Sequence, residues 1–213
     1  MTMTIDLLIA ALVLVAVQLR MTAALMPEKA RIVLAVVVFA WCMLPYPWGP
    51  AAWVLSYLAS FSVASGLLAV LAIKHRIVGY YWLPVNQLRG ACVLLVVLAL
   101  WFYPASMGST YLDPYSLGYG NFTLSTTLLL LGLFAWVLKA YASCIILVAA
   151  QLAFRLDLLA SDNLWDYLID PWLVCWAAGW LIRDRLLQSR ANKDGGQSVT
   201  GADDDAGQSD AAR

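Results

Sequence analysis

The segment that decides the fold class is residues 51–73, AAWVLSYLASFSVASGLLAVLAI, which contains no charged side chain. It begins directly after Pro50 and ends at the basic triplet Lys74-His75-Arg76. A transmembrane helix needs about 20 mostly apolar residues to cross the roughly 30 Å hydrocarbon core of a bilayer. The stretch meets that length without interruption, and it therefore predicts one membrane-spanning helix that ends at a membrane surface.

The composition of the whole chain agrees with a membrane protein. Of its 213 residues, 63% are hydrophobic and 12% are charged, whereas about 25% of the residues of a soluble domain are charged. A soluble domain of this length needs a charged surface that this sequence cannot supply. The 13 basic and 13 acidic residues cancel, so we expect no basic field for binding nucleic acid. The predicted fold class is an all-α integral membrane bundle.

Seven apolar segments meet or approach the length of a membrane span. They are predicted at residues 7–26, 30–44, 51–73, 84–103, 121–138, 142–159 and 171–187. The apolar run from 121 to 159 would be about 58 Å long as a single helix at 1.5 Å per residue, so we expect it to fold back between Lys139 and Ser143. We therefore predict a polytopic bundle of about seven transmembrane helices over residues 1–189.

The positive side chains indicate the orientation, because Lys and Arg in short loops are retained on the cytoplasmic side. If seven helices alternate, Arg155 alone lies on the outer side. The side chains on the opposite side are Arg20, Lys29, Arg31, Lys74, Arg76, Arg89, Lys139, Arg183 and Arg185. This predicts an outer N-terminus and a cytoplasmic C-terminus, in a bacterial inner membrane.

Both ends of the chain are polar. The start MTMTID has no basic region, so we expect no removable signal peptide. Residues 190–213 are rich in Gly, Ser and Asp and cannot bury enough apolar surface to fold. We predict that they form a disordered cytoplasmic tail, whose Asp203-Asp204-Asp205 run is a solvated stretch.

The first outer loop, residues 103–121, is long for a connection in a compact bundle, and loops of this length are often functional. Tyr111, Tyr115 and Tyr119 recur every four residues, and each combines an apolar ring with a hydroxyl suited to the water boundary. With Asp113, they are candidate contacts for a partner protein or for lipid headgroups. The alternative is an interfacial loop whose tyrosines lie at headgroup level, with Asp113-Pro114 as turn residues.

The second outer loop, residues 155–171, places Asp162, Asp166 and Asp170 four residues apart, as on one face of a helix. Trp165 and neighbouring leucines would occupy the other face. This pattern predicts an amphipathic helix along the outer interface, with its acidic side toward water. Asp162, Trp165 and Asp166 are therefore the candidate docking residues of this loop.

Two other interpretations of this acidic stretch stay open. Three close carboxylates repel one another, so a cation, either Arg155 or a divalent metal, would favour their ionised forms. Alternatively each side chain has a local role, in which Ser161 or Asp162 caps the short helix and Asp170 caps the next one, with Pro171 at its first position. We assign no metal ligands.

Inside the predicted bundle, polar groups are few. Small residues at successive fours, Ala52, Ser56, Ser60 and Ala64, are interpreted as a helix-packing seam. Trp172, Trp176 and Trp180 form a stripe expected to face lipid or a partner subunit. Gln151 and the serines of 51–73 are the deepest polar candidates, and the lack of a buried acid disfavours proton-coupled transport. Only Cys42 and Cys175 would lie near the outer face together, where a disulfide between them stays open.

The sequence contains none of the familiar catalytic signatures, such as GxSxG, HExxH, a P-loop or GxGxxG. Its single histidine, His75, lies between two cations and is a poor metal ligand. The sequence favours a non-enzymatic inner-membrane component without a cofactor, which docks a partner protein or lipid headgroups through its outer loops. One alternative is an enzyme acting on a lipid-linked substrate, with a divalent cation at Asp162 and Asp166. Another is a small-solute transporter.

Overall fold

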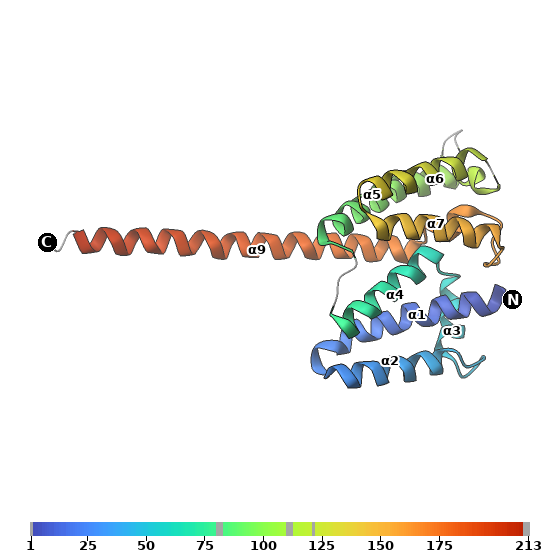
Figure 1. Ribbon diagram of the computed structural model, residues 1–213, viewed down its shortest axis with the longest axis horizontal. Helices are drawn as coiled ribbons and strands as arrows, with labels where there is room; N and C mark the ends of the chain where they lie inside the picture. The colour runs from blue at the N-terminus through green and yellow to red at the C-terminus, as the bar shows by residue number, and fades with distance from the viewer. Residues whose placement is uncertain (1, 80–82, 110–112, 121, 211–213) are drawn as a thin grey trace.

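The computed structural model describes residues 2–79, 83–109, 113–120 and 122–210 of the chain. Within these ranges the regular structure consists of nine α-helices and three short helical turns, with no strand. The long helices lie side by side along the length of the molecule (Figure 1). The predicted all-α class is confirmed.

Six of the seven predicted segments are single helices. They are α1 (Thr2–Thr22), α2 (Glu28–Cys42), α5 (Val85–Pro104), α6 (Phe122–Val137), α7 (Tyr141–Arg155) and α9 (Pro171–Asp210). Pro27 and Pro84 directly precede α2 and α5, because a proline there removes no hydrogen bond that the helix needs. The predicted reversal after α6 is confirmed at Lys139, whose φ angle is 58°.

The seventh predicted segment, residues 51–73, is not one helix, and that prediction is wrong. α3 (Pro50–Leu58) ends at a non-helical stretch, residues 59–62, and α4 (Val63–Val78) begins after it. Ala59 has a φ angle of 62°, which L-amino acids rarely adopt, and the Ser62 hydroxyl caps α4 by accepting the Ser65 N–H at 3.1 Å. The expected seam of small residues is therefore divided between two helices.

Four short elements complete the chain. They are the turns η1 (Ala23–Leu25), η2 (Ala105–Ser109) and η3 (Tyr115–Gly118), and the one-turn helix α8 (Leu164–Leu168). η1 and η2 directly follow α1 and α5, and η3 and α8 lie in the two loops singled out from the sequence.

Within the described parts of the chain, two stretches are long and apolar enough to cross a membrane. They are Met3–Leu25, with 23 residues, and Val85–Gly108, with 24 residues. The shares of their most apolar windows that are buried inside the protein are 33% and 22%. α6 and α7 are apolar but shorter, with 16 and 15 residues. The structure thus supports membrane association, and the seven-span topology stays a prediction.

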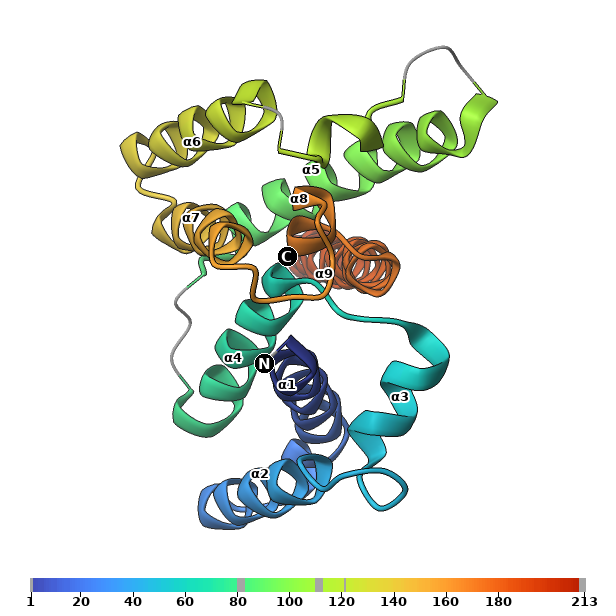
Figure 2. The ribbon, with the colours of Figure 1, turned by 90° about the vertical axis from the view of Figure 1, so that its right-hand side faces the viewer.

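Helix α4 lies at the centre of the arrangement and packs against α1, α7 and α8, as the view along the bundle shows (Figure 2). Gly66 permits the close approach to α1, because a Cβ atom there would lie 3.2 Å from the Ile9 side chain. α5 packs against α9, and the Arg89 guanidinium pairs with the Asp184 carboxylate at 2.8 Å. The contact between α4 and α8 places the amino end of α4 beside α8.

Helix α9 continues as one helix to Asp210 and extends away from the other helices (Figure 1). The division of the chain at residue 190 into a bundle and a disordered tail stays a prediction.

Candidate functional site

The two loops singled out from the sequence meet at one end of the bundle. The Tyr115 hydroxyl donates to the Asp166 carboxylate at 3.0 Å, and the Asn163 side-chain amide donates to the Tyr115 carbonyl at 2.9 Å. The Trp165 indole N–H donates to the Pro114 carbonyl at 2.9 Å. These bonds join residues 113–120 and 156–170 into one surface, which we call the loop platform.

Local turn chemistry builds each half of the loop platform. The Asp113 carboxylate accepts the Tyr115 N–H at 3.0 Å, as expected for Asp-Pro turn residues. In the other half, the Asn163 side chain caps α8 by accepting the Trp165 N–H at 2.9 Å. The cap is therefore Asn163 and not Ser161 or Asp162, because Asn163 directly precedes α8, has an extended backbone and accepts the N–H group of the second helical residue.

Gly118 allows the two halves to touch. A Cβ atom at this position would lie 1.7 Å from the Asn163 side-chain oxygen and 2.8 Å from the Trp165 ring. Such distances are far below van der Waals contact, so only glycine fits without a shift of the neighbouring loop. The close approach at Gly118 makes the loop platform one packed unit.

The predicted docking residues occupy different depths of the loop platform. Asp113 and Asp162 are exposed, and Tyr119 is 59% exposed. Tyr115 and Asp166 are half-buried, and Trp165 is 7% exposed. Tyr111 lies outside the described residues. The structure therefore brings together the two predicted loops, with three side chains facing outward and three supporting them; their docking role stays a prediction.

The predicted acidic face of a helix does not exist. α8 covers only Leu164–Leu168, so Asp162 precedes it and Asp170 follows it. Asp166 accepts hydrogen bonds from Ser161 and Tyr115, whereas Asp170 is buried against α4. α8 is itself largely buried, so it is not an amphipathic helix along the interface. Among the described residues, no three His, Cys, Asp or Glu side chains are placed to hold a metal ion.

Two phenols, the half-buried Tyr115 and the buried Tyr167, act as hydrogen-bond donors in this region. Burial, followed by the charge and the hydrogen bond of Asp166, raises the pKa of Tyr115 far above its ordinary value. Burial also raises the pKa of Tyr167, whose hydroxyl donates to the Leu159 carbonyl at 3.3 Å and accepts the Leu159 N–H at 3.1 Å. Both hydroxyls therefore keep their protons at neutral pH.

Asp170 connects the loop platform to the interrupted helix pair α3 and α4. Its side chain is buried, with 4% of the residue exposed. One carboxylate oxygen accepts the Ser62 N–H at 3.0 Å, the Ser62 hydroxyl at 2.7 Å and the Ser65 hydroxyl at 2.6 Å. The other accepts the Leu173 N–H at 2.8 Å, which confirms the predicted cap of α9. Four donors thus compensate the burial of one carboxylate.

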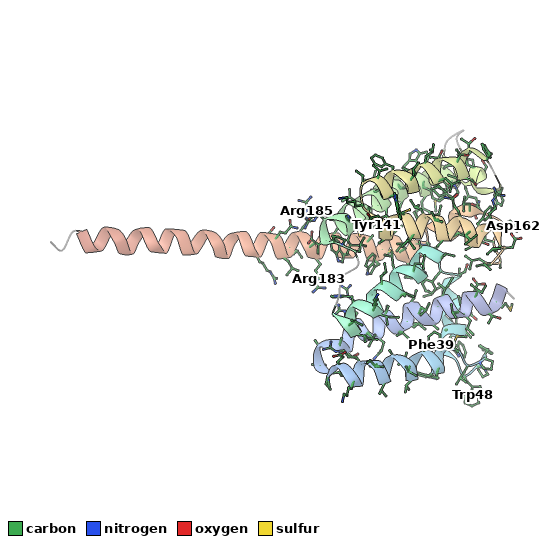
Figure 3. The ribbon with its side chains drawn as sticks, in the orientation of Figure 1. Phe39, Trp48, Tyr141, Asp162, Arg183 and Arg185 are labelled. Atoms are coloured by element: carbon green, nitrogen blue, oxygen red, sulfur yellow. The ribbon has the colours of Figure 1, made fainter. Side chains whose placement is uncertain are left out.

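A groove between α1, α3, α4 and α9 is the feature that sequence reasoning missed. It encloses about 450 Å³. Figure 2 shows how these four helices are arranged. The tryptophan stripe Trp172, Trp176 and Trp180 lines this groove, whereas we expected it to face lipid or a partner subunit. One end of the groove is basic, bordered by Arg20, His75, Arg76 and Arg183. Figure 3 shows Arg183 at the end of the bundle opposite Asp162.

Two acidic side chains are buried in the interior, whereas the sequence led us to expect no buried acid. Asp6, on α1, is 9% exposed. The second is Asp170, which lies beside α4. Among the described residues, one Asp6 oxygen and the Gln151 amide nitrogen are buried without a hydrogen-bond partner. Proton-coupled transport is therefore no longer disfavoured by the lack of a buried acid. Cys42 is buried, Cys175 is exposed and both are free thiols, so the disulfide left open above is absent.

Comparison of the chain with protein-family models, curated proteins and solved structures gives no match.

Proposed function

We propose that the chain is a multi-pass component of a bacterial inner membrane that docks a partner membrane protein on the loop platform. The observation that carries the proposal is the joining of two loops, about 50 residues apart in sequence, by the bond between Tyr115 and Asp166. A surface that is already ordered loses less conformational entropy when it binds. The order of the loop platform thus supports the non-enzymatic docking role expected from the sequence.

The sides of the bundle support the membrane placement. Large apolar side chains are exposed along α2, α5 and α6, for example Val36, Leu100 and Phe134. Soluble monomers rarely expose apolar patches larger than a few hundred Å². Arg183 and Arg185 lie at the end opposite the loop platform (Figure 3). Because basic residues are retained in the cytoplasm, the loop platform is proposed to lie outside.

The charge of the loop platform favours a partner protein over lipid headgroups. Its exposed charged side chains are acidic, namely those of Asp113, Asp157 and Asp162. The exposed Arg155, at the end of α7, directly precedes the 156–170 half of the loop platform. Such a surface repels anionic headgroups and attracts a basic segment of a partner. Tyr119 adds an exposed aromatic ring, and Tyr is enriched in protein interfaces. The proposed partner is a membrane protein with a basic outer segment.

Affinity purification from native membranes after mild crosslinking tests the proposal. We expect a stoichiometric partner with the natural chain, and its loss when Asp113→Asn, Tyr119→Ala and Asp162→Asn are combined. These exposed side chains can change without unfolding the bundle. Lys29→Gln, an exposed change on α2, is the matched control and keeps the partner. A chain recovered alone, or a partner retained by the triple variant, overturns the proposal.

The two alternatives stay predictions with less support. An enzyme with a divalent cation at Asp162 and Asp166 needs two free carboxylates, yet Asp166 already accepts from Ser161 and Tyr115. A small-solute transporter gains one specific observation, since the interruption between α3 and α4 beside a groove resembles the discontinuous helices of transporters. The carboxylate at that interruption, Asp170, is however occupied by four donors.

A further inference from the structure

We propose that the groove between α1, α3, α4 and α9 holds one anionic phospholipid. One of its acyl chains lies among the apolar side chains of the groove, and its phosphate lies against Arg20, Arg76 and Arg183. The groove is distinct from the loop platform, and its basic end lies at the end of the bundle opposite that platform. The proposal shares only the membrane placement with the proposed function.

The lining of the groove fits an acyl chain. Its volume of about 450 Å³ lies within the roughly 300–1,000 Å³ of small-ligand sites. Between its ends the lining is almost entirely apolar, with Val13, Leu14 and Val17 on one side and the α9 tryptophans on the other. Val17, Leu58 and Trp172 line the groove and are also exposed. The groove is therefore open along its side, so that a chain can enter from the membrane.

The charges at one end of the groove fit an anionic headgroup. Arg20 and Arg183 are exposed there, and the backbone of Arg76 is held by a 3.1 Å hydrogen bond from the Arg31 guanidinium to the Arg76 carbonyl. The nearby acid on α9, Asp184, is engaged by Arg89 at 2.8 Å and by Gln188 at 2.9 Å. The basic end therefore keeps an excess of positive charge.

Apolar lining and positive charge together select the class of ligand. A free anion such as phosphate makes no use of the apolar space, and a neutral lipid makes no use of the arginines. An anionic phospholipid satisfies both parts of the groove. Under the proposed orientation the basic end lies at the cytoplasmic surface, where anionic headgroups attract Lys and Arg.

Native mass spectrometry of the full chain in a non-ionic detergent tests this proposal. The chain is titrated with phosphatidylglycerol and with phosphatidylcholine of identical acyl chains. We expect one phosphatidylglycerol bound in preference to phosphatidylcholine. Arg20→Gln and Arg183→Gln should each weaken its binding about fivefold, and about 25-fold together. Arg185→Gln, exposed on the same helix but outside the groove, is the matched control and leaves binding unchanged.

A second variant tests the contribution of the apolar part of the groove. Ala72 lines the groove and is exposed, so Ala72→Trp fills space without opening the core. We expect it to abolish binding of both lipids. Val17→Trp, at a residue 49% exposed in the same groove, provides the same test if Ala72→Trp unfolds the helices by circular dichroism.

Several outcomes overturn the lipid site. They are equal affinity for both lipids, equal effects of Arg185→Gln and Arg183→Gln, unchanged binding in the filled groove, or displacement of the lipid by millimolar inorganic phosphate. None of these results affects recovery of a partner by the loop platform. Conversely, the triple variant of the platform should bind phosphatidylglycerol normally, so failure of one proposal is distinguishable from failure of the other.

Discussion

The Asp170 carboxylate shows how one side chain directs the backbone of a segment 108 residues away in sequence. At Ser62 the amino end of α4 presents an N–H group and a hydroxyl, and both donate to one Asp170 oxygen. Without such an acceptor, an interrupted helix inside an apolar bundle would leave buried donors unsatisfied. The carboxylate also lies at the amino ends of α4 and α9, where the helix dipoles favour negative charge.

Removing this carboxylate should therefore destabilise the protein. Asp170→Ala leaves the Ser62 and Ser65 hydroxyls without their acceptor and removes the cap of α9, so we expect a loss of about 3 kcal/mol in the free energy of unfolding. Denaturation in detergent micelles, followed by circular dichroism, measures the change. Asp162→Ala, at an exposed residue, should stay within about 0.5 kcal/mol of the natural chain. Equal stability of the two variants would show that the four hydrogen bonds contribute nothing.

At the level of the elements, local signals predict the helices and long-range contacts decide the exceptions. The starts of α2 and α5 follow from Pro27 and Pro84, and the reversal at Lys139 follows from the excessive length of the apolar run. The sequence of residues 59–62 contains no proline, glycine or charge that predicts the interruption, and Asp170, which accepts the Ser62 N–H there, is 108 positions away. A serine followed by a second serine three residues later, Ser62 and Ser65, was the one local hint of a helix start.

The loop platform offers an element-level test through its tightest contact. Gly118→Ala would place a Cβ atom 1.7 Å from the Asn163 side chain, so the two loops must separate. We expect loss of the partner in affinity purification and a lower unfolding midpoint. Gly90→Ala is the matched control, since nothing lies within 4 Å of that Cβ position in α5, and alanine stabilises a helix by about 0.5–1 kcal/mol. If Gly118→Ala behaves like Gly90→Ala, the loops are not packed as described.

At the level of the whole molecule, the formal charge is zero, but acidic and basic side chains lie at different ends of the bundle. The sequence places acidic and aromatic residues in two loops, and Figure 3 shows Asp162 of one of these loops at the end of the bundle opposite Arg183 and Arg185. Exposure of Asp113 and Asp162 could be predicted, because both lie in polar turns. The bond between Tyr115 and Asp166 could not, and neither could the groove, because both depend on which helices become neighbours in three dimensions.

The proposed topology predicts which residues face each side of the membrane. In a variant lacking Cys42, Cys92, Cys144 and Cys175, single cysteines are introduced as Ser116→Cys, Asp162→Cys, Lys139→Cys and Arg185→Cys. A membrane-impermeant maleimide should label the first two in intact cells and the last two only after permeabilisation. The critical pair is Lys139 and Asp162, because α6 and α7 have 16 and 15 residues.

Helices of that length extend only about 22–24 Å, less than the roughly 30 Å hydrocarbon core. Crossing therefore requires local thinning of the bilayer or polar flanking residues that reach the headgroups, and each of these adjustments costs little per ångström of mismatch. Lys139 lies at the reversal between these helices and can extend its ammonium group to the surface. If Lys139→Cys is labelled in intact cells together with Asp162→Cys, α6 and α7 do not cross, and the loop platform and the basic end do not lie on opposite sides of the membrane.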